Sequence, residues 1–250
     1  MRYFIEIAYD GLPYHGWQRQ PNGNSVQEEI ENAFSTILRT KINIVGAGRT
    51  DAGVHAKQLF AHFDIEQNWS VQDCHQFTYR LNRFLPATIA IKKITAVSPD
   101  AHARFDATSR SYEYHVSLAK NPFNIEHAYY VQQKIDISAM NEAAILLIGC
   151  KDFKCFSRSN TDVKTYICDV TEAFWEVRGD ELIFRITANR FLRNMVRAVV
   201  GTLLDVGKGK EDKNHIKLVL ASKDRGAAGT SAPAHGLYLV SVKYPEEIFL

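Results

Sequence analysis

The stretch RYFIEIAY, residues 2–9, places apolar side chains at every second position and runs into Asp10-Gly11, a dipeptide typical of turns. A period of two predicts a β-strand with one buried face. After the turn, residues 25–39 carry apolar side chains at helical spacing behind Ser25, a residue typical of helix caps. The chain is therefore expected to begin with a strand followed by a helix.

The same kinds of pattern predict the elements that follow along the chain. The first half adds strands at 42–47 and 58–65, a helix at 71–84 and a strand at 88–97. The second half has a strand at 111–118, a helix at 137–148, β-rich runs at 165–175 and 181–188, a helix at 191–206 and a strand at 237–244. The order βαββαβ thus occurs twice, which predicts an α+β protein with two ferredoxin-like halves.

Between the halves, SPDAHARFDATS at 98–109 shows no periodicity, so we expect domains at 1–105 and 106–250. Their antiparallel sheets would pack around a central cleft, the natural place for a ligand.

Bulk properties exclude several classes of protein. The 250 residues are 46% hydrophobic and 23% charged, as in ordinary globular proteins, and the net charge of +2 carries little information. The four cysteines form no CxxC pair, which favours reduced thiols. The N-terminus lacks a signal-peptide core, and no apolar run reaches the roughly 18 residues of a membrane span. A cytoplasmic protein without membrane contact is expected.

The stretch GAGRTDAGVHA, residues 46–56, sets Arg49 and Asp51 two positions apart among glycines and alanines. In extended chain their side chains share one side. Gly46, Gly48 and Gly53 would allow positive φ or the close approach of a bulky ligand. Asp51 is then a carboxylate that a cation holds and presents to a substrate, or else it only accepts backbone hydrogen bonds in a turn.

A second candidate group lies in NRFLRNMVRAVVGTLLDVGKGK, residues 189–210. Helical spacing would place Arg190, Arg193 and Arg197 in one stripe. A solvent-exposed helix face would explain Arg190 and Arg193 as well as a binding role would. Arg197 instead has apolar neighbours in the sequence, so we expect its guanidinium to be partly buried and to pair with a carboxylate. Residues 185–225 contain ten Lys and Arg but only four Asp and Glu, so this basic strip could bind successive RNA phosphates.

Aromatic residues supply a third group in RSYEYHV, residues 110–116, where Arg110, Tyr112 and Tyr114 share one face of a strand. Either tyrosine could simply pack in the core. Tyr112 could instead support a base that has left its stack. The histidines lack the spacing of a zinc pair, so no metal is expected, and no second acid near Asp51 suits glycosidase chemistry.

Taken together, six segments resemble the bacterial TruA-type tRNA pseudouridine synthases, a family that modifies uridines 38, 39 and 40 in the tRNA anticodon stem-loop. They are YDGLPYHGWQRQ (9–20), SVQEEIE (25–31), GAGRTDAGVHA (46–56), HARFDATSRSYEY (102–114), FLRNMVRAVVGTLLDVGKGK (191–210) and APAHGLYLV (232–240). The sequence departs from the family pattern in two places. Residues 85–89 read LPATI where the family often has LPxDI, and Lys151 occupies a position where the family usually has a histidine.

The resemblance implies a role for each candidate. Asp51 matches the nucleophile, Arg49 the arginine that turns the target base out, Tyr112 the tyrosine stacked on that base, and Arg197 the cation paired with the carboxylate. It also implies ferredoxin-like halves, a homodimer with a basic RNA-binding cleft, tRNA as the partner, and no cofactor. Two rivals remain open: a non-catalytic RNA-binding or RNA-folding protein that uses the same cleft, and a synthase acting on other RNAs.

Overall fold

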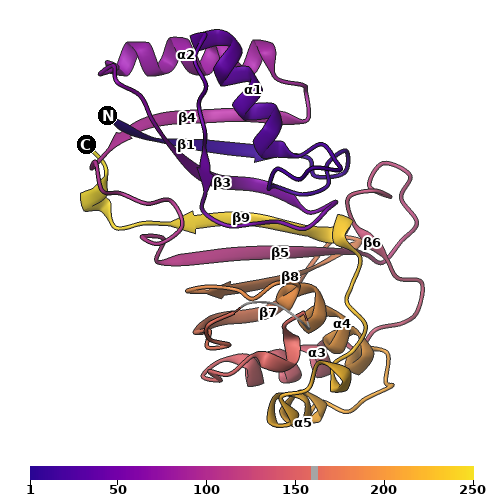
Figure 1. Ribbon diagram of the computed structural model, residues 1–250. Helices are drawn as coiled ribbons and strands as arrows, with labels where there is room; N and C mark the ends of the chain where they lie inside the picture. Colours follow the sequence, from indigo (N-terminus) through magenta and orange to yellow (C-terminus); the bar gives the residue numbers. More distant parts are fainter. Residues whose placement is uncertain (159–162) are drawn as a thin grey trace. The chain divides into compact units, whose positions relative to one another are not determined.

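The structure, a computed structural model, describes residues 1–158 and 163–250. The chain forms two compact units (Figure 1). We call residues 1–108 with 238–250 the N-terminal unit, and residues 109–237 the C-terminal unit. Both combine helices with mostly antiparallel strands, in agreement with the predicted α+β class. The division into domains 1–105 and 106–250 stays a prediction.

In the N-terminal unit the strand order is β4-β1-β3, and neighbouring strands are antiparallel. The elements are β1 (Arg2–Tyr9), α1 (Val26–Leu38), β2 (Val45–Gly46), β3 (His55–Asp64), α2 (Val71–Phe84), β4 (Ile89–Val97) and β9 (Leu237–Lys243). On its other edge β3 has two partners: β2 pairs at Ala61 and His62, and β9 runs parallel beside His55 and Ala56. The loop between β2 and β3, which contains Asp51, therefore leaves and re-enters the sheet on adjacent strands.

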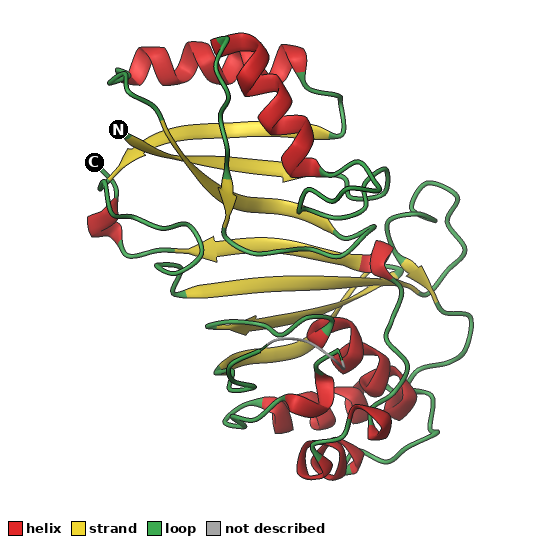
Figure 2. Ribbon diagram, viewed as in Figure 1, coloured by secondary structure: helices red, strands yellow, loops and turns green. Residues whose placement is uncertain are grey.

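The alternation in β1 produces the expected buried face. Its four members are Tyr3, Ile5, Ile7 and Tyr9. Helices α1 and α2 cover one face of the sheet (Figure 2), and the rings of Phe34 and Phe77 meet edge-on between them at 5.1 Å. Phe4 points to the opposite face, yet it is also buried because the rings of Tyr244 and Phe249 pack edge-on against it.

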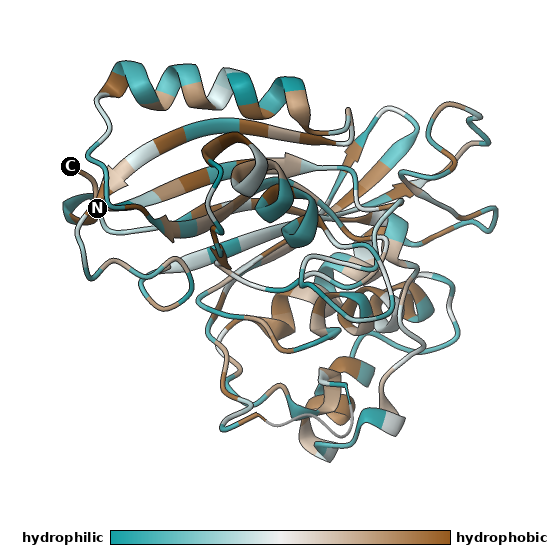
Figure 3. Cartoon of the chain, turned by 45° about the horizontal axis from the view of Figure 1, so that its top comes forward, coloured by the Kyte–Doolittle hydropathy of each residue, from teal (hydrophilic) through white to brown (hydrophobic). Residues whose placement is uncertain are grey.

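Both helices of this unit follow the sequence prediction closely. Ser25 caps α1 by accepting a hydrogen bond from the backbone N–H of Glu28. Helix α2 has the predicted bounds, and Ser70 and Asp73 form a capping box at its start. Figure 3 shows hydrophilic and hydrophobic residues in turn along α2, as expected for a helix with one buried stripe.

In the C-terminal unit the strand order is β5-β8-β7 with antiparallel neighbours, and the short β6 pairs parallel with β5. Its elements are β5 (Ser109–Ser117), β6 (Tyr129–Tyr130), α3 (Ile137–Ala144), β7 (Val170–Arg178), β8 (Glu181–Ala188), α4 (Met195–Gly207) and α5 (His215–Ser222). The three helices lie on one side of this sheet (Figures 1 and 2). Gly179, at φ +60°, makes the tight turn between β7 and β8.

Some predicted elements of this unit have different bounds. The strand expected from residue 165 begins only at Val170, and the helix expected at 137–148 ends at Ala144 and continues as a short 3₁₀ turn. Helix α5 was not expected. Among the residues that the structure describes, no helix is both long and apolar enough to cross a membrane.

Candidate functional site

The loop that carries Arg49 and Asp51 is anchored by the residue between them. Thr50 is buried, and its Oγ1 lies 2.8 Å from the hydroxyl of Tyr9. The Thr50 carbonyl accepts a hydrogen bond from the backbone N–H of Trp17 at 3.2 Å. Arg49 is exposed and Asp51 half-buried. The chain is thus fixed on its inner side at Thr50 while the two charged neighbours remain at the surface of the unit.

Two glycines of the segment 9–17 allow that segment to pack closely against the loop. A Cβ on Gly16 would lie 2.5 Å from the Thr50 carbonyl oxygen, and Gly16 has φ +99°. A Cβ on Gly11 would lie 2.0 Å from the carbonyl oxygen of Val54. The sequence assigned positive φ or the close approach of a ligand to Gly46, Gly48 and Gly53. Gly53 has φ +75°, as expected, whereas at Gly46 the ring of Trp17 occupies the space.

Replacing Gly16 by alanine should destabilise this arrangement. The new Cβ would clash with Thr50, and the positive φ is unfavourable for any residue with a side chain. We expect the free energy of unfolding to fall by about 1–3 kcal/mol in chemical denaturation.

Gly48→Ala is the matched control, because a Cβ there meets no atom within 4 Å and Gly48 has no positive φ. We expect a change below about 0.5 kcal/mol. Equal stabilities for the two variants would contradict the anchoring role of Gly16.

His55, the first residue of β3, contacts the segment 9–17 that packs against this loop. Its ring is buried, accepts a hydrogen bond from the backbone N–H of Gly11 at Nδ1 and lies 3.0 Å from the Asp10 carboxylate. The ring of Tyr238, at the start of β9, stacks on it at 4.5 Å. The sequence offered His55 only as one of several scattered histidines, so this structural role was missed.

In the C-terminal unit Arg197 occupies the first turn of α4 and is half-buried among apolar neighbours, as predicted. Its Nε donates a 2.7 Å hydrogen bond to the carbonyl of Ala232, whose own N–H donates to the Arg197 carbonyl at 2.9 Å. This double link fixes the direction of the guanidinium. Ala232 is 35 positions away, and no sequence pattern pointed to it.

The segment that holds Arg197 packs closely on α4. A Cβ on Gly201 would lie 1.8 Å from the carbonyl oxygen of Thr230, and the N–H of Gly229 donates to the Thr202 hydroxyl at 2.9 Å. Arg225 braces the same segment with hydrogen bonds to the carbonyls of Ala228 and Gly229 and to the Ser231 hydroxyl. The backbone around Ala232 is therefore rigid enough to orient Arg197.

The predicted arginine stripe is wrong for Arg190 and Arg193. Helix α4 begins at Met195, because Asn194 adopts a left-handed conformation at φ +66° and the Arg193 carbonyl accepts a hydrogen bond from the backbone N–H of Arg158. Arg190 and Arg193 therefore lie in the loop before the helix, apart from the helical Arg197.

The two tyrosines of β5 differ in burial and in their contacts. Tyr114 is fully buried, donates to the carbonyl of Pro233 at 2.9 Å and belongs to the core; burial raises the pKa of its hydroxyl strongly. Tyr112 is half-buried, and the ring of Phe191 meets it edge-on at 5.0 Å and 85°. Phe191 thus limits the orientation of the Tyr112 ring, a contact that the sequence did not predict.

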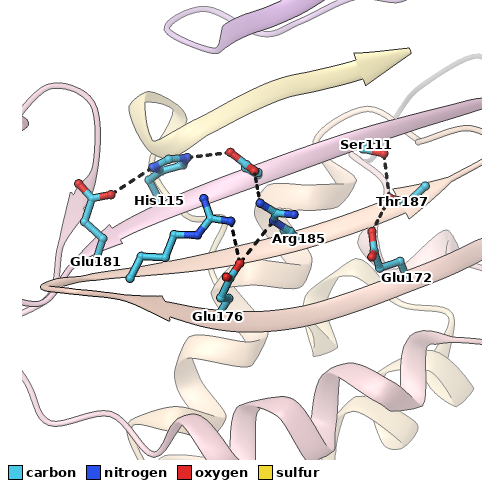
Figure 4. Close-up of polar contacts among 9 residues, drawn as sticks. Ser111, His115, Glu172, Glu176, Glu181, Arg185 and Thr187 are labelled. Atoms are coloured by element: carbon cyan, nitrogen blue, oxygen red, sulfur yellow. Dashed lines mark hydrogen bonds and ion pairs between the residues drawn. The ribbon is translucent and has the colours of Figure 1, made fainter. Parts of the chain in front are cut away.

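Several basic residues of the strip expected at 185–225 contact acids. On one face of the β5-β8-β7 sheet, Arg185 lies 3.1 Å from Glu113 and 3.7 Å from Glu176 (Figure 4). Three lysines of the strip also contact acids: Lys210 with Asp205, Lys213 with Glu142 and Lys223 with Asp152. A phosphate track along the strip stays a prediction.

Figure 4 shows how acidic that sheet face is. The His115 ring lies between Glu113, at 3.2 Å, and Glu181, at 3.6 Å. Glu172 accepts a hydrogen bond from the Thr187 hydroxyl, which also contacts Ser111. Carboxylates outnumber arginines here, so this face is unfavourable for RNA phosphates.

Comparison with known proteins gives the family. Residues 6–106 and 143–245 match the family model described as tRNA pseudouridine synthase. Proteins named tRNA pseudouridine synthase A are 53% identical in Bacteroides thetaiotaomicron, covering 99% of this chain and 92% of that protein, and 52% in Parabacteroides distasonis, covering 99% and 98%. A protein of the same name in Bacillus subtilis is 40% identical over 98% of this chain and 99% of its own length. The chain belongs to the tRNA pseudouridine synthase family.

The site residues fall into two groups. Asp51 and Arg49 belong to the N-terminal unit, whereas Arg197 and Tyr112 belong to the C-terminal unit. Within the C-terminal unit, the adjacent carbonyls of Ala232 and Pro233 accept from Arg197 and Tyr114, and Tyr114 lies two positions from Tyr112 on the same strand face. The pairing of Asp51 with Arg197 stays a prediction.

Proposed function

We propose that this chain converts uridine to pseudouridine at positions 38, 39 and 40 of the tRNA anticodon stem-loop, with Asp51 as nucleophile. The observation that carries the proposal is the rigid loop around Thr50, which presents a half-buried carboxylate in a member of the tRNA pseudouridine synthase family. The names of the relatives support tRNA as the substrate class. The family resemblance supports the three positions.

The reaction is an isomerisation with balanced atoms. The bond from sugar C1′ to uracil N1 breaks, the uracil turns, and C1′ bonds to C5; the proton leaves C5, and N1 takes one up. Nothing is oxidised or lost, and the family resemblance implies no cofactor. A carboxylate can add to C1′ or remove a sugar proton in the first step, and both routes require Asp51 ionised beside the nucleotide.

Each remaining candidate has a distinct task in this scheme. Arg197, held by Ala232, would pair with Asp51 and favour its charged form. Arg49 would turn the target base out and fill the space it leaves, which offsets part of the few kcal/mol that unstacking costs. Tyr112, steadied by Phe191, would stack on the flipped uracil and keep it from escaping after the bond to N1 breaks.

The predicted architecture belongs to the same proposal. Each half would be a ferredoxin-like βαββαβ unit, and a central basic cleft would take the RNA in a cytoplasmic homodimer. In the N-terminal unit, the strand order β4-β1-β3 with β2 at the β3 edge supports this reading. The domain division at 105/106 would separate the residues of the catalytic loop from the stacking tyrosine and Arg197.

Tyr112→Leu should lower kcat/KM about 5- to 160-fold, since stacking on an aromatic ring contributes about 1–3 kcal/mol per base. Tyr112→Phe keeps the ring and should stay within about 3-fold of wild type. Steady-state assays on anticodon stem-loop RNA measure both. A leucine variant as active as the phenylalanine variant would exclude a stacking role.

The proposal is tested by incubating the purified chain with two RNA hairpins, one from the anticodon arm and one from the T arm of a tRNA. We expect pseudouridine at positions 38–40 of the first hairpin and none in the second. Binding without product would favour the non-catalytic rival. Product in a messenger or small nuclear RNA at an equal rate would favour a synthase with another substrate.

A further inference from the structure

Residues 228–232, which we call the clamp segment, run along α4 toward the start of that helix. The N–H of Gly229 donates to the hydroxyl of Thr202 at 2.9 Å. Ala232 and Arg197 are linked twice, by the N–H of Ala232 at 2.9 Å and by the Nε of Arg197 at 2.7 Å. The position of the clamp segment therefore determines where the Ala232 carbonyl meets the side chain of Arg197.

Arg225 holds the clamp segment through three acceptors. It is half-buried at the start of a short 3₁₀ turn, Arg225–Ala227. Its Nη1 donates to the carbonyls of Ala228 at 3.2 Å and Gly229 at 3.1 Å, and its Nη2 donates to the Ser231 hydroxyl at 2.9 Å. Gly229 is thus fixed through both of its backbone groups, the N–H at α4 and the carbonyl at Arg225.

Ser231 connects Arg225 to the start of α4. Its hydroxyl oxygen accepts a hydrogen bond from Arg225 at 2.9 Å and another from the side-chain amide of Asn194 at 2.6 Å. Asn194 directly precedes the first residue of α4. Because Ala232 is the next residue after Ser231, a displacement of Ser231 also displaces the Ala232 carbonyl.

The direction of the Arg197 guanidinium depends on this carbonyl. A guanidinium is planar, so a hydrogen bond at Nε sets the direction in which its other N–H groups point. Functional groups act efficiently when they are held within about 0.5 Å of the productive position. Without Arg225, three groups of the clamp segment lose a donor, and the chain that leads to Ala232 is less restrained.

We propose that Arg225 is a positioning residue for the reaction, because it holds the clamp segment where the Ala232 carbonyl orients Arg197. The inference rests on the proposed function, since it takes Arg197 as the cation beside Asp51. It extends that function to a residue that acts through Arg197 rather than on the RNA. Arg225 is also the last residue of the basic strip at 185–225, so the competing role is direct contact with an RNA phosphate.

The test begins with Arg225→Met in the full chain, assayed on an anticodon stem-loop hairpin. The methionine keeps an apolar stem and removes the guanidinium. We expect kcat to fall about 10- to 100-fold, since a misplacement of about 1 Å costs up to about 10²-fold, while KM stays within about 3-fold. A raised KM together with a salt slope of binding reduced by about 0.7 would indicate a phosphate contact and overturn the inference.

The same substitution is then made in the Arg197→Met background. A residue that acts through Arg197 has no further effect once Arg197 is gone, so kcat should change less than about 2-fold there. A purely structural role would lower the rate by the same factor in both backgrounds. Losses that multiply in the double variant would therefore overturn the inference.

Ser231→Ala provides a milder second variant if Arg225→Met does not fold. It removes the hydroxyl that joins Arg225 to Asn194 but keeps the two carbonyl contacts of Arg225. We expect kcat to fall roughly 2- to 10-fold, and this effect should also vanish in the Arg197→Met background. A wild-type kcat in Ser231→Ala would overturn the coupling.

Arg178→Met is the matched control, because it deletes an exposed guanidinium that pairs with Glu176 on the same unit. It should leave kcat unchanged in both backgrounds, and a loss equal to that of Arg225→Met would overturn the specific role of Arg225. Thermal unfolding establishes that each variant is folded at the assay temperature.

Failure of the proposed function has a separate signature in this experiment. A wild-type chain that forms no pseudouridine would overturn the proposed function and this inference with it. A wild-type chain that forms pseudouridine and loses activity in Arg197→Met, but shows multiplying losses in the double variant, would overturn the role of Arg225 alone.

Discussion

Asp51→Ala should abolish pseudouridine formation while tRNA affinity stays within a few-fold of wild type. The Asp51 carboxylate can act as a nucleophile or a base at the sugar, whereas the Thr50 hydroxyl is buried beside that of Tyr9; removing such a carboxylate costs about 10⁴-fold or more in rate. Affinity depends mainly on phosphate contacts made elsewhere. Product formation and filter binding on the same tRNA give the two readouts.

Thr50 makes the anchoring contacts of this loop, so the alanine variant should keep the wild-type fold and unfolding midpoint. Asp51→Asn, which preserves shape without charge, should be as inactive as Asp51→Ala. A purified alanine variant that modifies tRNA at the normal rate would refute the nucleophile assignment.

Arg197→Met should lower kcat about 10²- to 10³-fold with the fold retained, because loss of a preorganised charge at a reacting group has effects of this size. The methionine keeps the apolar packing of the half-buried stem and removes the guanidinium. It also removes the Nε hydrogen bond to Ala232, so the free energy of unfolding should fall by about 1 kcal/mol. Single-turnover assays and thermal unfolding measure the two effects.

A matched control is Arg178→Met, which deletes an exposed guanidinium on the acidic sheet face and should retain wild-type activity. Arg197→Lys keeps the charge but changes the geometry at Ala232, so its rate should lie between those of wild type and Arg197→Met. A wild-type rate in Arg197→Met would remove the argument for an ion pair with Asp51.

Local patterns were sufficient for most elements of the fold. Alternation in residues 2–9 and the serine cap before α1 depend on neighbours in the chain, and β1, α1 and α2 appear where these signals place them. The start of α4 could not be read this way. Its apolar periodicity continues back to Phe191, but contacts to Arg158 and Ser231 hold the backbone out of the helix.

The candidate site shows the same limit. The sequence pointed to Asp51, Tyr112 and Arg197 by residue type and family resemblance, but the contacts that orient them come from distant segments. Thr50 is positioned by Tyr9, and Arg197 by the carbonyl of Ala232. Carbonyls and the close backbone approach at Gly16 leave no recognisable sequence pattern, so the sequence alone could not reveal these supports.

The most direct measurement is nucleotide-resolution mapping of pseudouridine in an unmodified tRNA that carries uridines at 38, 39 and 40 and in the T loop, after single turnovers with wild type and Asp51→Asn in parallel. We predict modification confined to positions 38–40 with wild type and none with the asparagine variant. Pseudouridine made by Asp51→Asn at a rate near wild type, or wild-type product found only in the T loop, would contradict this account.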